Sequence, residues 1–165
     1  MKKSTALEEQ VVAKLIEKGY HISFAESCTG GLLAATLVNV SGSSKVFQES
    51  YVTYSNEAKV KNLSVKEGTL EAFGAVSEET AIEMAQGVAK KANTEVGVST
   101  TGVAGPTGGT KEKPVGLVYI ACSIEGHVRV LKCAFKGDRQ RNREDTVKAA
   151  LRLLLDELIE KRFIH

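Results

Sequence analysis

The sequence predicts an α/β protein: a three-layer α/β/α sandwich on a mixed β-sheet, in a single domain over residues 1–165. In the first hundred residues, apolar runs of strand length alternate with amphipathic stretches of helical period, which is typical of parallel strands joined by helices. Two further strand-like runs then meet at Glu125 and Gly126, which indicates an antiparallel hairpin. A sheet that combines both kinds of pairing is mixed.

The first half of the chain predicts one helix and then two strands separated by a second helix. The first helix is expected over residues 5–18, starting at a capping box formed by Thr5 and Glu8. A strand, a helix and a second strand are expected over residues 21–25, 32–38 and 46–54.

The second half predicts three helices, three strands and a final helix. Helices are expected over residues 56–63, 66–73 and 77–92, and Ser77 is the expected cap of the third. Strands are expected over residues 96–101, 115–124 and 127–135, followed by a helix over about residues 141–161. No linker, repeat or low-complexity segment divides the chain.

Composition excludes several classes of protein. With 42% hydrophobic and 25% charged residues, the chain has the balance of an ordinary soluble domain. Its 22 basic and 20 acidic residues lack the one-sided charge that favours nucleic acid or an anionic membrane as partner. No apolar run approaches the roughly 18 residues of a membrane span, and the N-terminus has no signal-peptide pattern. We therefore expect a cytoplasmic protein without nucleic-acid or membrane partners.

The three cysteines predict reduced thiols. They are odd in number and have no CxxC spacing, which argues against a disulfide framework and a zinc site. Cys122 and Cys133 fall in strand-like runs and are expected in the core. Cys28 differs because it adjoins a glycine-rich turn. No metal-ligand spacing occurs, so neither a metal nor a cofactor is expected.

Three polar segments each follow a predicted strand: residues 26–31, 55–59 and 102–109. Ligands on sheets of this kind bind beyond the carboxyl ends of the strands. The three segments are therefore predicted to converge on one cleft.

The turn at residues 25–31, with the sequence AESCTGG, leads from a strand into a helix. Backbone N–H groups at a helix start favour a phosphate, a carboxylate or a developing oxyanion. The turn is not a Walker A loop, because no lysine follows its glycines, and glycines do not bracket Ser27 as in G-x-S-x-G. From these residues alone, a binding turn and simple close packing both remain open.

A serine nucleophile at Ser27 needs a base. The three histidines, His21, His127 and His165, lie outside the glycine-rich loops, and the last two are expected on the surface. A lysine becomes a base when burial lowers its pKa, and Lys59 follows the end of the second strand. Cys28 is the alternative nucleophile, since a thiolate is intrinsically more reactive.

Six segments in this order closely resemble the CinA C-terminal domain family: residues 25–31, 41–44, 52–59, 74–77, 101–106 and 113–116. The resemblance runs from about residue 5 to residue 160. Proteins of this family are nicotinamide-nucleotide amidohydrolases. The resemblance implies an α/β/α sandwich with a mixed sheet, in agreement with the predicted elements.

The resemblance further implies hydrolysis of the carboxamide of nicotinamide mononucleotide to nicotinate mononucleotide and ammonia. Ser27 would be the nucleophile, Lys59 its general base, and Tyr54 a neighbour that steers the proton or contacts the ring. Substrate-binding roles are implied for Thr29, Gly30, Gly31, Ser43, Ser44, Thr101, Gly102, Gly105 and Arg139. The hydrolysis would need no metal or cofactor, and the protein would be a homodimer.

Other interpretations stay open beside these roles. Arg139 is the expected phosphate partner, whereas Arg141 and Arg143 are expected on a solvated face. Glu26 orients the turn, orients Lys59, or is an exposed carboxylate. The alternative function is a nucleotide-binding regulatory module without turnover. Many family members carry a larger N-terminal domain that hydrolyses ADP-ribose, and that second activity is not expected here.

Overall fold

A computed structural model describes residues 5–160 as a five-stranded sheet between two layers of helices. The strand order is β2-β1-β3-β4-β5. The strands are β1 Ile22–Glu26, β2 Phe47–Val52, β3 Val96–Gly102, β4 Leu117–Ile124 and β5 His127–Ala134. β1 runs parallel to β2 and β3, while β4 is antiparallel to both β3 and β5. The predicted mixed sheet and the hairpin are confirmed.

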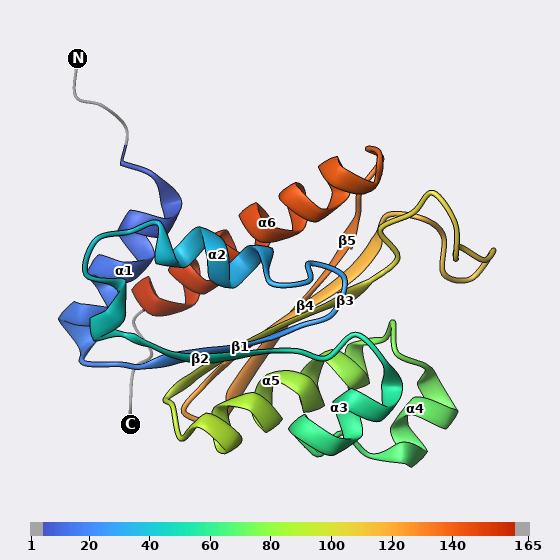
Figure 1. Ribbon diagram of the computed structural model, residues 1–165, viewed down its shortest axis with the longest axis horizontal. Coiled ribbons are helices and arrows are strands. Elements are labelled where there is room, and N and C mark those ends of the chain that lie inside the picture. Colours follow the sequence, from blue (N-terminus) through green and yellow to red (C-terminus); the bar gives the residue numbers. More distant parts are fainter. Residues whose placement is uncertain (1–4, 161–165) are drawn as a thin grey trace.

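The helices form two layers, one on each face of the sheet (Figure 1). One layer holds α1 Leu7–Lys18, α2 Leu32–Val38 and α6 Arg139–Ile159. The other holds α3 Asn56–Leu63, α4 Glu67–Phe73 and α5 Glu78–Ala92. The three-layer α/β/α sandwich is therefore confirmed.

Each face of the sheet buries its own set of apolar side chains. Between the sheet and α1, α2 and α6, fully buried residues such as Leu15, Phe24 and Leu154 form one large cluster. On the opposite face, α5 packs Met84 and Val88 against the sheet. At about 25 cal/mol per Å² of buried apolar area, these two interfaces supply most of the driving force for folding. Cys122 lies in the large cluster as predicted, and Cys133 packs against it half-buried.

Helix ends differ from the predictions in two places. The cap of α1 is Ala6, without a side-chain hydrogen bond, so the predicted capping box of Thr5 and Glu8 is wrong. The carbonyl of Thr5 instead accepts a hydrogen bond from the Gln10 side chain. α6 begins before residue 141, at Arg139, because Asp138 caps it by accepting the N–H of Arg141 at 2.8 Å.

Other expectations concern helix caps and surface residues. Ser77 caps α5 as predicted. His127 is exposed as predicted, whereas His165 and the predicted helix end at residue 161 lie outside the described residues. Within residues 5–160, no helix is both long enough and apolar enough to cross a lipid bilayer.

Candidate active site

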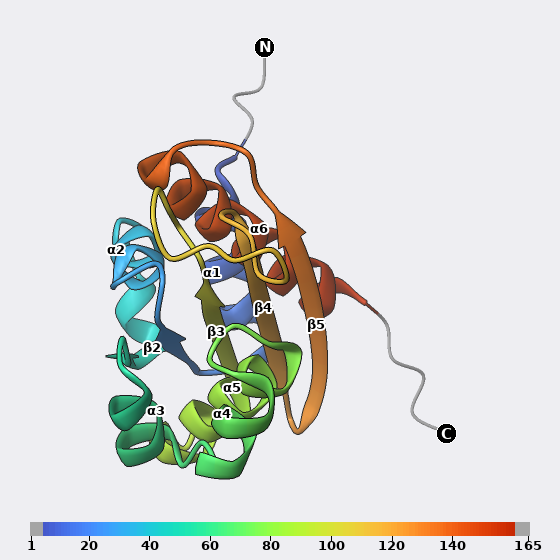
Figure 2. The same ribbon diagram turned by 90° about the vertical axis from the view of Figure 1, so that its right-hand side faces the viewer.

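The carboxyl ends of β1, β2 and β3 meet at one edge of the sheet. Val52 of β2 and Thr100 of β3 both lie opposite Glu26 of β1 in register. The carboxyl ends of the three strands lie toward the viewer in Figure 2. The chain segments that leave these strands enclose a cleft of about 340 Å³. The lining residues are Ser27, Cys28, Tyr54, Lys59, Ala75, Val76, Thr101, Gly102, Val103, Ala104, Gly105, Thr107, Gly108 and Arg139. The predicted convergence of three strand-end segments is therefore observed.

Ser27 and Lys59 come from different elements and meet inside this cleft. Ser27 is the first residue after β1, and Lys59 lies in the first turn of α3, which is held in place by the cap of Ser55 on Ala58 N–H. The Lys59 Nζ atom donates a hydrogen bond to Ser27 Oγ at 3.1 Å. Both side chains are buried, and only 1% of Lys59 is exposed.

The surroundings of the Lys59 amine make its proton easier to lose than that of a solvated lysine. Burial lowers the pKa of Lys59 to about 8. Among the described residues no carboxylate forms an ion pair with it; its other two contacts are the carbonyls of Thr53 at 2.8 Å and Tyr54 at 3.4 Å. When Lys59 loses a proton, two N–H groups remain for the two carbonyls, and the lone pair can accept the hydroxyl of Ser27 in place of the hydrogen bond that Nζ donates as an ammonium.

The turn after Ser27 is anchored by a buried carboxylate. Glu26 is fully buried and accepts the N–H groups of Leu33 at 2.8 Å and Ala34 at 3.1 Å, so it caps α2 from the end of β1. It also accepts the Thr29 hydroxyl at 2.6 Å. The interpretation of Glu26 as an exposed carboxylate is therefore wrong, and the one that orients the turn is correct.

Gly30 and Gly31 allow the turn to enter the helix sharply. Their φ angles are +58° and +102°, in the left-handed region that disfavours residues with a side chain. The Gly30 N–H closes the turn by donating to the carbonyl of Ser27 at 3.1 Å. Ser27 therefore stands at a tight, backbone-bonded corner directly before α2.

Tyr54 and Arg139 form the rim of the cleft. Arg139 donates to the Tyr54 hydroxyl at 3.1 Å and to the carbonyl of Gly105 at 2.8 Å. It thereby joins the start of α6 to the end of β2 and to the loop after β3. The Tyr54 side chain is 62% exposed, and among the described residues its hydroxyl contacts neither Ser27 nor Lys59. The geometry favours a rim contact with a ligand over proton steering for Tyr54.

Cys28 is unsuited to act as a nucleophile. Only 6% of it is exposed, and its side chain belongs to the large apolar cluster. Burial raises the pKa of its thiol to about 12. At neutral pH the reactive thiolate is therefore absent.

The comparison with known proteins identifies the family. The family model described as the CinA C-terminal domain matches residues 4–158 of the chain. The chain belongs to the CinA C-terminal domain family. Solved CinA structures have the same fold. One is the competence damage-inducible protein A (ComA) of Klebsiella pneumoniae, with a TM-score of 0.91 and 34% identity over 94% of this chain and 97% of that one. Another is CihA of Agrobacterium tumefaciens, with a TM-score of 0.87 and 39% identity over 97% of this chain and all of that one.

Curated relatives are longer than this CinA domain. A CinA-like protein of Kosmotoga olearia is 59% identical over 146 residues, which are 88% of this chain but 35% of that protein. A relative from Clostridium acetobutylicum is 57% identical over 155 residues, which are 38% of its length. The chain thus spans less than two-fifths of the curated relatives it matches.

Not all substrate contacts implied by the family resemblance reach the cleft. Thr101, Gly102, Gly105 and Arg139 line it. Thr29, Gly30 and Gly31 are not among its lining residues and lie between Ser27 and the start of α2. The hydroxyl of Thr101 is already used, since it donates to the carbonyl of Ala75 at 2.8 Å.

Ser43 and Ser44 lie at the opposite end of the sheet. They belong to a single 3₁₀ turn, Ser43–Lys45, before β2. The next residue, Val46, accepts a hydrogen bond from Ile22 N–H at the start of β1, whereas Ser27 follows the end of that strand. Within one chain, the predicted contact of these two serines with the nucleotide is therefore not supported.

Sequence reasoning missed a role for Arg143. Its guanidinium is half-buried and donates to the carbonyls of Cys28 and Thr29, so the expectation of a solvated face is wrong for this residue. That expectation is correct for Arg141, which is exposed and pairs with Asp145 on its own helix. The sequence could have indicated this role. Arg143 lies four residues after Arg139, and residues four apart share one face of a helix.

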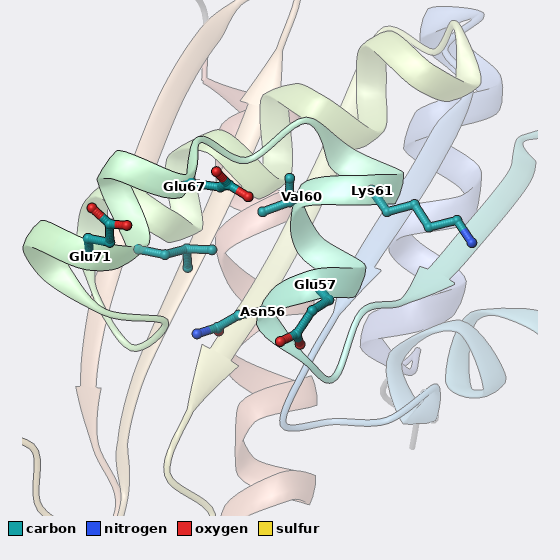
Figure 3. Close-up of a pocket in the computed structure, with 7 residues that line it drawn as sticks. Asn56, Glu57, Val60, Lys61, Glu67 and Glu71 are labelled. Atoms are coloured by element: carbon teal, nitrogen blue, oxygen red, sulfur yellow. The ribbon is translucent and has the colours of Figure 1, made fainter.

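A second hollow, of about 440 Å³, lies between α3 and α4 (Figure 3). It is lined by Asn56, Glu57, Val60, Lys61, Glu67, Leu70 and Glu71. The charged side chains among them are exposed, and none of those shown holds a partner from the other helix. Across residues 5–160, no group of three or more His, Cys, Asp or Glu side chains is arranged to hold a metal ion.

Proposed function

We propose that this CinA domain hydrolyses the carboxamide of nicotinamide mononucleotide, giving nicotinate mononucleotide and ammonia through an acyl-enzyme on Ser27. The observation that carries the proposal is the 3.1 Å contact between Ser27 Oγ and the buried Lys59 Nζ in the floor of the cleft. The substrate is the one that the family resemblance implies. The reaction class rests on the geometry of the two side chains.

Acylation begins with Lys59 neutral. Its lone pair takes the proton of the Ser27 hydroxyl while Oγ bonds to the amide carbon, which forms a tetrahedral intermediate with a negative oxygen. Lys59 then returns this proton to the amide nitrogen. The C–N bond breaks, ammonia leaves, and an ester between Ser27 and the nicotinoyl group remains.

Deacylation uses the same base a second time. Lys59 takes a proton from a water molecule, whose oxygen bonds to the ester carbon. The bond from Ser27 Oγ to that carbon breaks, and Oγ recovers the proton from Lys59. The nicotinate product leaves as the carboxylic acid and loses its proton to solvent, which gives the carboxylate and returns the site to its starting state.

The remainder of the cleft suits a nucleotide. Backbone groups of the loop after β3 and the guanidinium of Arg139 face the opening. A guanidinium binds phosphate oxygens through charge-assisted hydrogen bonds, so Arg139 is the proposed partner of the ribose phosphate. Binding would exchange its present bonds to Tyr54 and Gly105 for bonds to the ligand.

The test is ammonia release from nicotinamide mononucleotide by purified protein, with Ser27→Ala and Cys28→Ala compared. We expect Ser27→Ala to lose at least about 10⁴-fold in kcat, and Cys28→Ala to keep activity within about threefold. Mass spectrometry of an acid-quenched reaction should find the nicotinoyl adduct on Ser27. Full activity in Ser27→Ala would overturn the serine mechanism. Tight binding of the nucleotide by folded protein that releases no ammonia would favour the regulatory module.

We further propose that the domain acts as a homodimer in the cytoplasm, as the family resemblance implies. Light scattering of the purified protein tests the first part. A monomer mass at micromolar concentration would contradict the homodimer.

A further inference from the structure

Arg143 reaches from the second turn of α6 to the turn that follows Ser27. Its Nε atom donates to the carbonyl of Cys28 at 3.1 Å, and its Nη2 atom donates to the carbonyl of Thr29 at 2.8 Å. The two contacts join elements more than a hundred residues apart in sequence. One planar guanidinium thus fixes the orientation of two consecutive carbonyls relative to each other, which a single hydrogen bond does not do.

The carbonyls of the turn are held by further hydrogen bonds, beside the contact of the Thr29 hydroxyl with Glu26. Besides the two from Arg143, the Gly30 N–H donates to the carbonyl of Ser27 at 3.1 Å. Because each trans peptide is planar, its N–H points away from its carbonyl. The Ser27 carbonyl is turned toward Gly30, so the Cys28 N–H on the same peptide points away from Gly30.

Cys28 belongs both to the apolar cluster and to the lining of the cleft. The Cys28 N–H lies near the thiol of its own residue, and no backbone carbonyl among the described residues accepts it. In serine acyl transfer, the N–H of the residue after the nucleophile is well placed to bind the oxyanion.

We infer that Arg143 is a positioning residue for the transition state: by clamping the carbonyls of Cys28 and Thr29, it holds the Cys28 N–H where the oxyanion forms. The inference rests on the proposed acyl transfer at Ser27. Arg143 does not touch the substrate in this arrangement. Its loss should therefore weaken stabilisation of the tetrahedral intermediate while leaving binding of the ground state unchanged.

The kinetic test compares Arg143→Ala and Arg143→Lys with Arg141→Ala. Arg141 is the matched control, because it lies two residues earlier on α6 and, among residues 5–160, its side chain forms hydrogen bonds only with Asp145. We expect Arg143→Ala to lose about 10²-fold in kcat with KM changed less than about threefold. Arg143→Lys should recover part of the loss, and so should guanidinium ion added to Arg143→Ala. Unchanged kcat in Arg143→Ala would overturn the inference.

A second measurement separates positioning from general damage to the fold. Pyridine-3-boronic acid forms a tetrahedral, negatively charged adduct with a serine Oγ and so imitates the intermediate. We expect Arg143→Ala to bind this boronic acid about 10²-fold more weakly than the wild type does. Its affinity for nicotinate mononucleotide should stay within about threefold of the wild-type affinity. An equal loss for both ligands would show a merely structural role and overturn the inference.

The two measurements also separate this inference from the proposed function. If the wild type releases no ammonia from nicotinamide mononucleotide but binds the boronic acid through Ser27, the proposed substrate fails and the effect of Arg143 is still measured. If the wild type is active and Arg143→Ala matches it in kcat and boronate affinity, the inference alone fails.

Discussion

The two faces of α3 carry lysines in opposite situations. Lys59 points inward, is 1% exposed, and contacts one hydroxyl and two carbonyls. Lys61, two residues later, is exposed on the side of the α3–α4 hollow. The hollow is larger than the cleft, at about 440 Å³ against about 340 Å³. The volume of a cavity therefore does not identify the candidate site. The convergence of buried polar groups from several elements does.

The same contrast recurs on α6. Arg143 is half-buried against two backbone carbonyls, whereas Arg141 is exposed and pairs within its own helix. Surface ion pairs of this kind contribute about 0–1 kcal/mol to stability. In each helix, one basic residue is at least half-buried against polar groups near the cleft, and its neighbour of the same type is exposed.

Among these charged residues, the largest effect is expected from removing Lys59. Lys59→Met keeps a long apolar side chain but has no base, so we expect kcat for ammonia release to fall by about 10³–10⁴-fold. Lys61→Met should stay within about twofold. Comparable losses in the two variants would break the contrast between the faces of α3.

Removing the charge of Lys59 should also stabilise the folded protein. Holding the pKa of Lys59 at about 8, against an ordinary 10.5, costs the folded state about 3 kcal/mol while the amine is protonated. Lys59→Met also leaves two buried carbonyls without a hydrogen-bond donor, which reduces the gain in stability by about 1 kcal/mol. We expect the variant to gain about 2 kcal/mol in free energy of unfolding at pH 7, measured by urea denaturation. Lys61→Met should be neutral by comparison.

The gain should depend on pH in a defined direction. Below pH 8 the amine is protonated in both states, so the penalty is complete. Between pH 8 and 10.5 the folded lysine is neutral while the unfolded one still binds a proton, so the wild type becomes more stable as pH rises. The advantage of Lys59→Met therefore shrinks across this window. An advantage that grows there would contradict a lowered pKa.

Activity should follow protonation of Lys59 in acid. With a pKa near 8, kcat/KM should fall about tenfold for each pH unit below that value and reach a plateau above it. The acid limb should persist in Arg143→Ala, because that variant leaves the base in place. A rate that stays level from pH 8 to pH 6 would exclude a lysine base.

The smallest effect is expected in the α3–α4 hollow. The double variant Glu67→Gln and Glu71→Gln removes two of its exposed carboxylates, and we expect kcat and KM to stay within about twofold. Stability should change by less than about 0.5 kcal/mol, as is usual for surface substitutions. A tenfold change in KM would show that this hollow contributes to substrate binding.

The sequence by itself determined the elements and the edge of the sheet where the site lies. Periodicity and turn residues predicted the strands and helices, and the carboxyl-end rule brought Ser27, Lys59 and the loop after β3 to one cleft. These patterns are local, so they can be read along the chain. The family resemblance added specific roles, and within one chain its expectation for Ser43 and Ser44 is not met at the cleft.

Only the tertiary structure decided how polar groups are paired and how deeply they are buried. The buried cap by Glu26, the two carbonyls on Lys59 and the clamp by Arg143 join residues from separate elements. Whether a lysine is a solvated cation or a base depends on the water removed around it, and that depends on packing across the whole fold. Spacing alone therefore made Arg141 and Arg143 look alike, although only Arg143 holds the turn at Ser27.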